Sequence, residues 1–233
     1  MFQRRKPERS VVERTVTLID NTANELPLAR KTAMLLDVTE SQLVLVDYQA
    51  RLLPVIFENS LLVANALRLA QLARLMVVPA WGTEQNPSRL GENVAELKTL
   101  CAQTLGKMHF SAVEEGLGEW LRPPAKPVAG NARSLPKHLQ KPPAHAAERN
   151  TVVIAGCEAH ICLLQTALDL LEDEFEVWVV TDACGSRTER NRDAAFDRLA
   201  GAGAELVTTE MVAFEWLRTA EHAQFRAVQA LIK

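Results

Sequence analysis

The sequence predicts an α/β fold: a three-layer sandwich with helices on both faces of a central, mostly parallel, six-stranded sheet of Rossmann-like type. Short apolar, β-branched runs alternate with segments whose apolar residues recur at helical spacing. The strand runs are apolar almost throughout, which is typical of strands buried on both faces. With 233 residues, 48% of them hydrophobic, the chain is long enough for one sizeable core.

The alternating pattern predicts six strands, and the expected ranges are 43–47, 75–80, a short one near 106–109, 152–155, 175–181 and 205–208. The first helix is expected over 61–73, because Leu62, Ala66, Leu69 and Ala73 share one helical face. The polar stretch 81–90 contains Gly, Asn and Pro and predicts a loop. Further helices are expected at 94–100, after Cys162, at 189–200 and towards Lys233.

The domain is expected to span residues 39–233, after an N-terminal extension or arm over residues 1–38. Within it, the segment at about 121–150 contains six prolines and few apolar residues. This composition predicts a long exposed insert. A lid and a contact between subunits are the alternatives for this insert.

Composition narrows the class of protein. The net charge of −3 and the isoelectric point near 6.0 do not favour nucleic acid or an anionic membrane as a partner. No apolar run approaches the length of a membrane span, and the basic N-terminus lacks the apolar stretch of a signal peptide. The four cysteines lack CxxC spacing, so we expect free thiols in a cytoplasmic protein.

Three residues follow or end predicted strands and are candidates for chemistry. Cys162 lies near the first turn of a helix, where free N–H groups and the helix dipole favour a thiolate. Asp47 ends the first strand, and Lys107 lies in the short third one. Because ligands bind at the carboxyl ends of parallel strands, the three side chains are expected to converge there. The ammonium would lower the thiol pKa, and the carboxylate would accept its proton.

Three separated segments carry a family resemblance: 45–49 (LVDYQ), 106–111 (GKMHFS) and 156–167 (GCEAHICLLQTA). They resemble the isochorismatase-like cysteine hydrolases, and the segments 83–87 and 181–187 are similar to the isochorismatase domain-containing branch of that family. The resemblance extends from about residue 39 to the C-terminus, except for the insert.

The resemblance implies a catalytic triad in which Cys162 is the nucleophile, Asp47 the general base and Lys107 the electrostatic partner. It implies an oxyanion hole formed by the N–H groups of Glu158 and Cys162, and a cis peptide between Cys157 and Glu158. The substrate pocket implied by the resemblance is lined by Tyr48, Gln49, Glu84, Phe110 and His160. We assign His160 to positioning or packing rather than to catalysis.

A cysteine at position 162 favours the amidase branch of the family, so the expected reaction is hydrolysis of a C–N amide bond of a small molecule through a thioester. The related nicotinamidases bind a metal through Asp and His in the loop after the second strand, and this loop has no His here. We therefore expect no metal and no cofactor. Family members form dimers or tetramers, which predicts a homo-oligomer.

Other functions remain open. An idle relative that acts as an interaction or scaffold protein is the main alternative, although the presence of Asp47, Lys107 and Cys162 together argues against it. Dinucleotide binding is disfavoured because no GxGxxG motif follows the first strand. Thiol redox sensing would need a partner thiol near Cys162. The sequence does not identify the substrate.

Overall fold

The computed structural model describes residues 35–123 and 149–233, which belong to one compact unit. Its centre is a six-stranded sheet with the order β3-β2-β1-β4-β5-β6, in which all neighbours pair in parallel. The strands are β1 Ser41–Val46, β2 Ala80–Gln85, β3 Gln103–Lys107, β4 Thr151–Gly156, β5 Glu176–Val180 and β6 Glu205–Val207. The predicted parallel sheet is thus confirmed.

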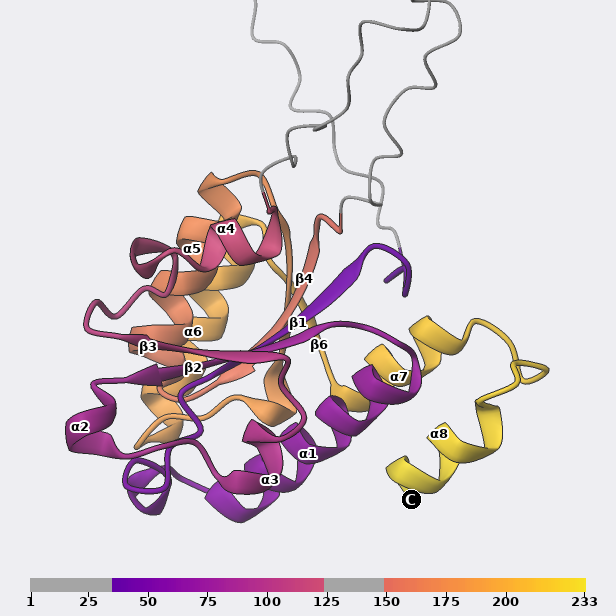
Figure 1. Cartoon of the computed structure of the whole chain (residues 1–233), viewed down its shortest axis with the longest axis horizontal. Coiled ribbons are helices and arrows are strands. Elements are labelled where there is room, and N and C mark those ends of the chain that lie inside the picture. Colours follow the sequence, from indigo (N-terminus) through magenta and orange to yellow (C-terminus); the bar gives the residue numbers. More distant parts are fainter. Residues whose placement is uncertain (1–34, 124–148) are drawn as a thin grey trace, which may run out of the picture. The chain divides into compact units, whose positions relative to one another are not determined.

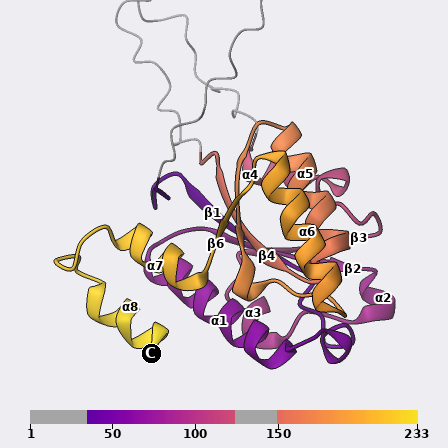
Figure 2. The same ribbon diagram turned by 180° about the vertical axis from the view of Figure 1, so that it is seen from behind.

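Helices cover both faces of this sheet (Figures 1 and 2), with α5 and α6 on one side and α1 and α7 on the other. The helices are α1 Asn59–Leu75, α2 Pro87–Leu90, α3 Ala95–Lys98, α4 Leu117–Leu121, α5 Leu164–Glu172, α6 Glu189–Ala202, α7 Thr209–Leu217 and α8 Phe225–Ile232. Short turns are the 3-10 segments η1 Leu53–Val55, η2 Val113–Glu115 and η5 Thr181–Ala183, and the π-helical segment η4 Ala159–Leu163. No described helix is long and apolar enough to cross a membrane.

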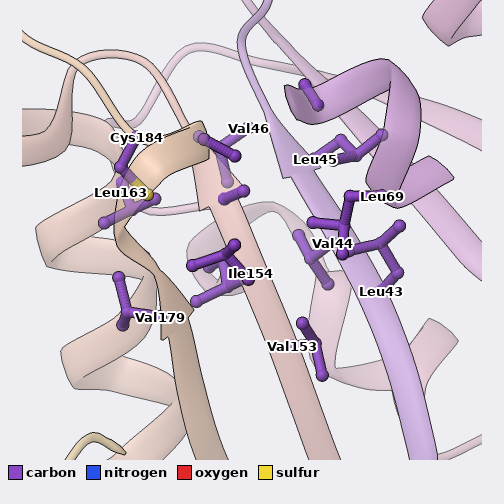
Figure 3. Packing of buried hydrophobic residues seen from close by; sticks show 14 of the residues in the cluster. Leu43, Val44, Leu45, Val46, Leu69, Val153, Ile154, Leu163, Val179 and Cys184 are labelled. Atoms are coloured by element: carbon purple, nitrogen blue, oxygen red, sulfur yellow. The ribbon is translucent and has the colours of Figure 1, made fainter. Parts of the chain in front are cut away.

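The core lies on both sides of β1 and β4, the two central strands. Every residue of both strands is buried, and Figure 3 shows Val44 and Ile154 among the packed side chains. The face of α1 predicted from helical spacing is the buried one. Central strands of a parallel sheet are apolar on both faces, so helices must cover each face.

The second strand is a correction to the sequence prediction. The run 75–80 is not a strand: α1 continues to Leu75, and a turn follows in which Val77 is exposed with a φ of 58°. The strand is β2, Ala80–Gln85, and all of it except Ala80 lies in the stretch 81–90 that was predicted as a loop. Its polar side chains are buried because each finds a partner: Thr83 bonds Asp47 after β1, Glu84 accepts from Lys98 in α3, and Gln85 accepts from Lys107 in β3. Apolar character alone gives no sign of these partners.

The residues that flank the proline-rich insert lie at the amino ends of the strands. Gln42 donates hydrogen bonds to Leu121 O and Arg149 O, at 2.9 and 2.7 Å. Arg149 in turn donates to the carbonyls of Val38 and Ser41. The candidate residues lie instead at the carboxyl ends of the strands, where Lys107 ends β3, Asp47 follows β1 and Cys162 follows β4. Residues 1–34 of the extension and 124–148 of the insert lie outside the described residues, so the predicted roles of both segments and the boundary at residue 38 stay predictions.

Gly156 allows β1 and β4 to approach closely at their carboxyl ends, next to the candidate residues. It pairs with Val46, and a Cβ at this position would overlap the Val46 carbonyl oxygen and lie 2.9 Å from the Val46 Cα. Backbone atoms in the centre of a sheet cannot move aside cheaply. Alanine is therefore excluded here by the sheet itself.

We expect Gly156→Ala to destabilise the protein by about 1–3 kcal/mol or more, because the added methyl group overpacks the strand pair. The matched control is Gly201→Ala in α6, where a Cβ would meet nothing within 4 Å. There we expect a gain of about 0.5–1 kcal/mol from helix propensity. Urea denaturation measures both free energies of unfolding, and an equal effect of the two substitutions would contradict this account of Gly156.

Candidate active site

Asp47 follows β1 directly and is completely buried. Its φ of 55° is left-handed, a conformation that Asp adopts more readily than most residues and that is often found at functional sites. Its N–H bonds the Thr83 carbonyl at 3.1 Å, and Thr83 Oγ1 donates to Asp47 Oδ1 at 2.7 Å. The second carboxylate oxygen, Oδ2, has no hydrogen bond in the described part of the chain.

Lys107 ends β3, two strands away from Asp47, and its ammonium is buried beside that carboxylate. Nζ lies 2.9 Å from Asp47 Oδ2, and neither side chain is exposed. The contact is an ion pair whose geometry falls short of a hydrogen bond. Nζ donates to Gln85 Oε1 at 2.6 Å and to Phe110 O at 3.0 Å. A buried ammonium requires such compensation, and β1, β2 and the segment after β3 supply it together.

Cys162 lies in the turn after β4, in the π-helical segment η4 that leads into α5. The widened turn is closed by a hydrogen bond from Leu163 N to Glu158 O at 3.3 Å. Such turns are rare and are found mostly at functional sites. The thiol is 5% exposed, and its Sγ lies 3.9 Å from Gln85 Oε1. The structure therefore brings Asp47, Lys107 and Cys162 together around Gln85.

The electrostatics of the thiol correct a prediction from the sequence. Burial, and after it the Asp47 carboxylate, raise the pKa of Cys162 to about 12, whereas Lys107 lowers it by less. The sequence-based expectation was that the ammonium and the helix N-terminus would lower this pKa. Desolvation disfavours the thiolate more than the ammonium favours it, since the ammonium is already paired. At neutral pH the resting cysteine is a thiol.

The turn between β4 and Cys162 is held by the segment after β5. Ala159 N donates to Gly185 O at 2.7 Å, and Gly185 N donates to Gly156 O at 3.1 Å. Cys157 and Gly185 form a parallel bridge, so the pairing of β4 continues into this turn.

The expected cis peptide between Cys157 and Glu158 is absent, because all peptide bonds of the described residues are trans. A non-proline cis bond costs about 3–4 kcal/mol. The trans chain here already makes backbone hydrogen bonds on both sides of this peptide, from Cys157 N to Val46 O at 2.9 Å and from Ala159 N to Gly185 O. These hydrogen bonds stabilise the trans peptide between Cys157 and Glu158.

The carboxylate of Glu158 is part of a polar cluster beside the turn. Arg187 Nε lies 2.8 Å from its Oε1, and His160 Nδ1 lies 3.4 Å from its Oε2. His160 Nδ1 also lies 2.9 Å from Ser186 Oγ. Burial lowers the pKa of His160, and Glu158 partly opposes this. His160 lies in η4, and its ring contacts the side chains of Glu158 and Ser186, in keeping with the positioning role assigned to it.

The other residues predicted to line the pocket make contacts of their own. Tyr48 is buried and donates to Ala183 O at 2.6 Å, while Gln49 bonds the backbone of Gln85 through both side-chain atoms. Glu84 accepts from Asn93 N and Lys98 Nζ, on the side of β2 away from Gln85. Phe110 is 51% exposed, and its carbonyl holds Lys107. The structure does not bring Tyr48, Gln49 or Glu84 to the thiol.

Thr83 and Gln85 are site residues that the sequence analysis missed. They alternate on one face of β2, which places Thr83 against Asp47 and Gln85 against Lys107 and Cys162. Period-two spacing of polar residues beside a predicted Asp would have been the available signal. It was hidden because residues 81–90 were interpreted as a loop.

No group of three or more His, Cys, Asp or Glu in the described residues could hold a metal ion. The expectation of a protein without metal or cofactor stays a prediction, because part of the chain lies outside the description.

Several known proteins are similar to this chain in sequence. The family described as "Isochorismatase domain" matches residues 133–211. Isochorismatase domain-containing protein 2 of Bos taurus is 37% identical over 172 residues, which cover 74% of this chain and 73% of that protein. The Homo sapiens protein of that name is 36% identical with the same coverage.

Solved structures share the fold. The structure of MAR1 ribonuclease from Caenorhabditis elegans aligns with a TM-score of 0.72 at 30% identity, covering 85% of this chain and 92% of that one. YcaC from Pseudomonas aeruginosa, with hexane-2,5-diol and covalent acrylamide, gives 0.71 at 26%, covering 86% and 92%. YcaC of Escherichia coli, an octameric hydrolase of unknown specificity, gives 0.69 at 26%, covering 86% and 97%. The predicted α/β fold is thereby confirmed.

The charge environment of Cys162 predicts opposite effects of two substitutions on its alkylation by iodoacetamide. Asp47→Asn removes a carboxylate that raises the thiol pKa, so labelling should become faster. Lys107→Met removes a cation that lowers it, so labelling should become slower. Below the pKa, each unit changes the thiolate fraction about tenfold.

Site-resolved mass spectrometry at pH 8 measures these rates, and Cys101 in the same molecule is the internal reference. Because either substitution breaks a buried ion pair, circular dichroism must first show that each variant is folded. Equal shifts in the same direction would contradict the assigned electrostatics.

Proposed function

The chain belongs to the isochorismatase domain family, and from this membership we propose that it is a hydrolase that cleaves a C–N amide bond of a small molecule through a thioester on Cys162. The observation that carries the proposal is the buried Asp47 Oδ2, which has no hydrogen bond and lies in the same cluster as a protonated thiol. A base with a free acceptor beside a nucleophile that must lose a proton suits acyl transfer.

The proposed reaction begins when Asp47 accepts the Cys162 proton as the sulfur attacks the carbonyl carbon. The negative charge moves to the carbonyl oxygen, where the N–H groups of Glu158 and Cys162 bind it. Collapse of this intermediate breaks the C–N bond, and Asp47 gives its proton to the leaving nitrogen. Water then attacks the thioester with Asp47 as the base, the acid is released, and the proton returns to sulfur.

Lys107 has a supporting role in this scheme. Its Nζ lies 2.9 Å from Asp47 Oδ2, so it orients the carboxylate and balances its charge. Retention of the cation in a dry site keeps the carboxylate a usable base rather than an isolated buried charge. The family resemblance implies the same division of roles.

The surroundings support a small substrate. Cys162, Asp47 and Lys107 are at most 5% exposed. A surface hollow of about 520 Å³ is lined by Phe110, whose carbonyl binds Lys107, and by Gln165, about one helical turn after Cys162. We propose that a small amide approaches along this hollow.

A ribonuclease activity, which the name of the Caenorhabditis elegans protein would suggest, has less support here. RNA-binding proteins present basic surfaces, and this chain carries a net charge of −3. The arrangement of thiol and carboxylate suits an amide carbonyl better than a phosphodiester.

Turnover of small primary amides and carbamoyl compounds, followed by ammonia release, tests the proposal. We expect Cys162→Ala to abolish turnover and Asp47→Asn to reduce it by orders of magnitude with the fold retained. Cys101→Ala is the matched control, because this half-buried thiol lies outside the cluster. Activity that survives Cys162→Ala would refute the nucleophile, and native protein inactive on every amide would favour the scaffold function.

We also propose that the chain forms a homo-oligomer, for which the octameric Escherichia coli relative gives support. Several large apolar side chains are exposed on a single chain, among them Val55 in η1, Phe57 just before α1 and Leu61 in the first turn of α1. Light scattering coupled to gel filtration should give a mass of two or more chains, and Leu61→Lys should lower it if this patch is an interface. A monomer at micromolar concentration would refute the assembly.

A further inference from the structure

We propose that Gln85 is a positioning residue that keeps Cys162 in its protonated resting form and fixes the Lys107 ammonium beside Asp47. The inference rests on the proposed role of Cys162 as nucleophile and adds the residue that governs its state. Gln85 ends β2 and lies opposite Lys107 in the β2–β3 register. The role follows from the contacts of Gln85 rather than from its residue type.

The side-chain amide of Gln85 has only one sensible orientation. Its Nε2 donates to Met108 O at 2.8 Å, and its Oε1 accepts from Lys107 Nζ at 2.6 Å. The reversed amide would direct an NH₂ group at an ammonium and an oxygen at a carbonyl oxygen, which are both repulsive. Amide orientations are assigned from such partners, and here both partners agree.

This orientation determines which form of the cysteine is compatible with the resting site. Gln85 Oε1 can only accept, and Cys162 Sγ lies 3.9 Å from it. A hydrogen bond over this contact requires sulfur to carry its proton. A thiolate would face the negative end of the amide dipole at the same place. The contact therefore stabilises the thiol and disfavours the thiolate.

The ammonium is saturated in the same arrangement. It has three N–H donors, and it donates to Gln85 Oε1 at 2.6 Å, to Phe110 O at 3.0 Å and to His109 O at 3.5 Å. The ion pair with Asp47 Oδ2, at 2.9 Å, comes in addition to these hydrogen bonds. No donor is left over for a sulfur anion while Gln85 accepts one of them. Gln85 thus occupies a donor of the ammonium that a sulfur anion would otherwise share.

The backbone around Gln85 is fixed by a second glutamine. Gln49 Oε1 accepts from Gln85 N at 2.8 Å, and Gln49 Nε2 donates to Gln85 O at 3.0 Å and to Gly91 O at 2.6 Å. Gln49 is completely buried. A polar side chain held at its backbone and at both side-chain atoms has little freedom, which is what positioning of a reactive pair requires.

Two substitutions at position 85 separate this role from ordinary packing. Gln85→Met keeps the length but removes the acceptor, so the thiol loses its partner and the ammonium gains a free donor. We expect Cys162 to react faster with iodoacetamide at pH 8. Gln85→Glu places a carboxylate at the same point, which disfavours the thiolate, so Cys162 should react more slowly. A shift of one pKa unit in either direction is about tenfold in rate.

The matched control is Gln42→Met. Gln42 is also buried and also bonds through both side-chain atoms, but it lies at the opposite end of the sheet, near Leu121 and Trp81. It should lower the free energy of unfolding without changing the labelling of Cys162. Labelling is read by mass spectrometry at each cysteine and needs no substrate, so the result is independent of whether amides are hydrolysed.

Opposite changes in the two Gln85 variants support the proposal. Loosened packing would accelerate labelling in both, and that result, or unchanged rates in both, would overturn it. If Gln85→Met does not fold, the Gln85→Glu variant decides alone, since an equal or faster rate there contradicts the proposed role.

Discussion

The buried ion pair between Lys107 and Asp47 is the constraint on which the site depends. Neither side chain is exposed, so each charge would be strongly destabilising without the other. Their distance of 2.9 Å requires that the carboxyl ends of β1 and β3 lie at the same end of the sheet, with β2 between them. The register of β2 and β3 meets this requirement and places Gln85 opposite Lys107. Thr83, Gln85 and the Phe110 carbonyl then bind the remaining donors and acceptors. Fold and site are thus specified by one electrostatic requirement.

Burial of that pair also determines the state of the cysteine. An ammonium already neutralised by a carboxylate attracts a thiolate weakly, while the same dry surroundings strongly disfavour a new negative charge. The pKa of Cys162 is consequently raised to about 12. A thiol of this kind is poorly reactive towards oxidants and alkylating agents at neutral pH. Reaction then depends on removal of the proton during attack, and this is why the open oxygen of Asp47 matters more than the charge of Lys107.

The sequence was sufficient for much of the fold and for the three central residues of the site. Apolar runs located β1, β4 and β5, and strand ends located Asp47, Lys107 and Cys162, because parallel strands end at one edge. It failed at β2, where an apolar run belongs to the end of α1 and a polar run forms the buried strand. Polar strand residues are hidden from periodicity rules when their partners come from other strands. The thiol pKa was wrong in direction because burial is a property of the assembled fold.

Two buried glutamines show how a functional polar residue differs from a structural one. Gln42 bonds the carbonyls of Leu121 and Arg149 and the indole of Trp81, groups whose charge does not change. Gln85 bonds an ammonium and a thiol, and the thiol loses its proton during the proposed reaction. Both glutamines satisfy the rule that buried polar atoms need partners. Only Gln85 couples that requirement to a proton, so the chemistry of the partners, more than the burial, identifies it as part of the site.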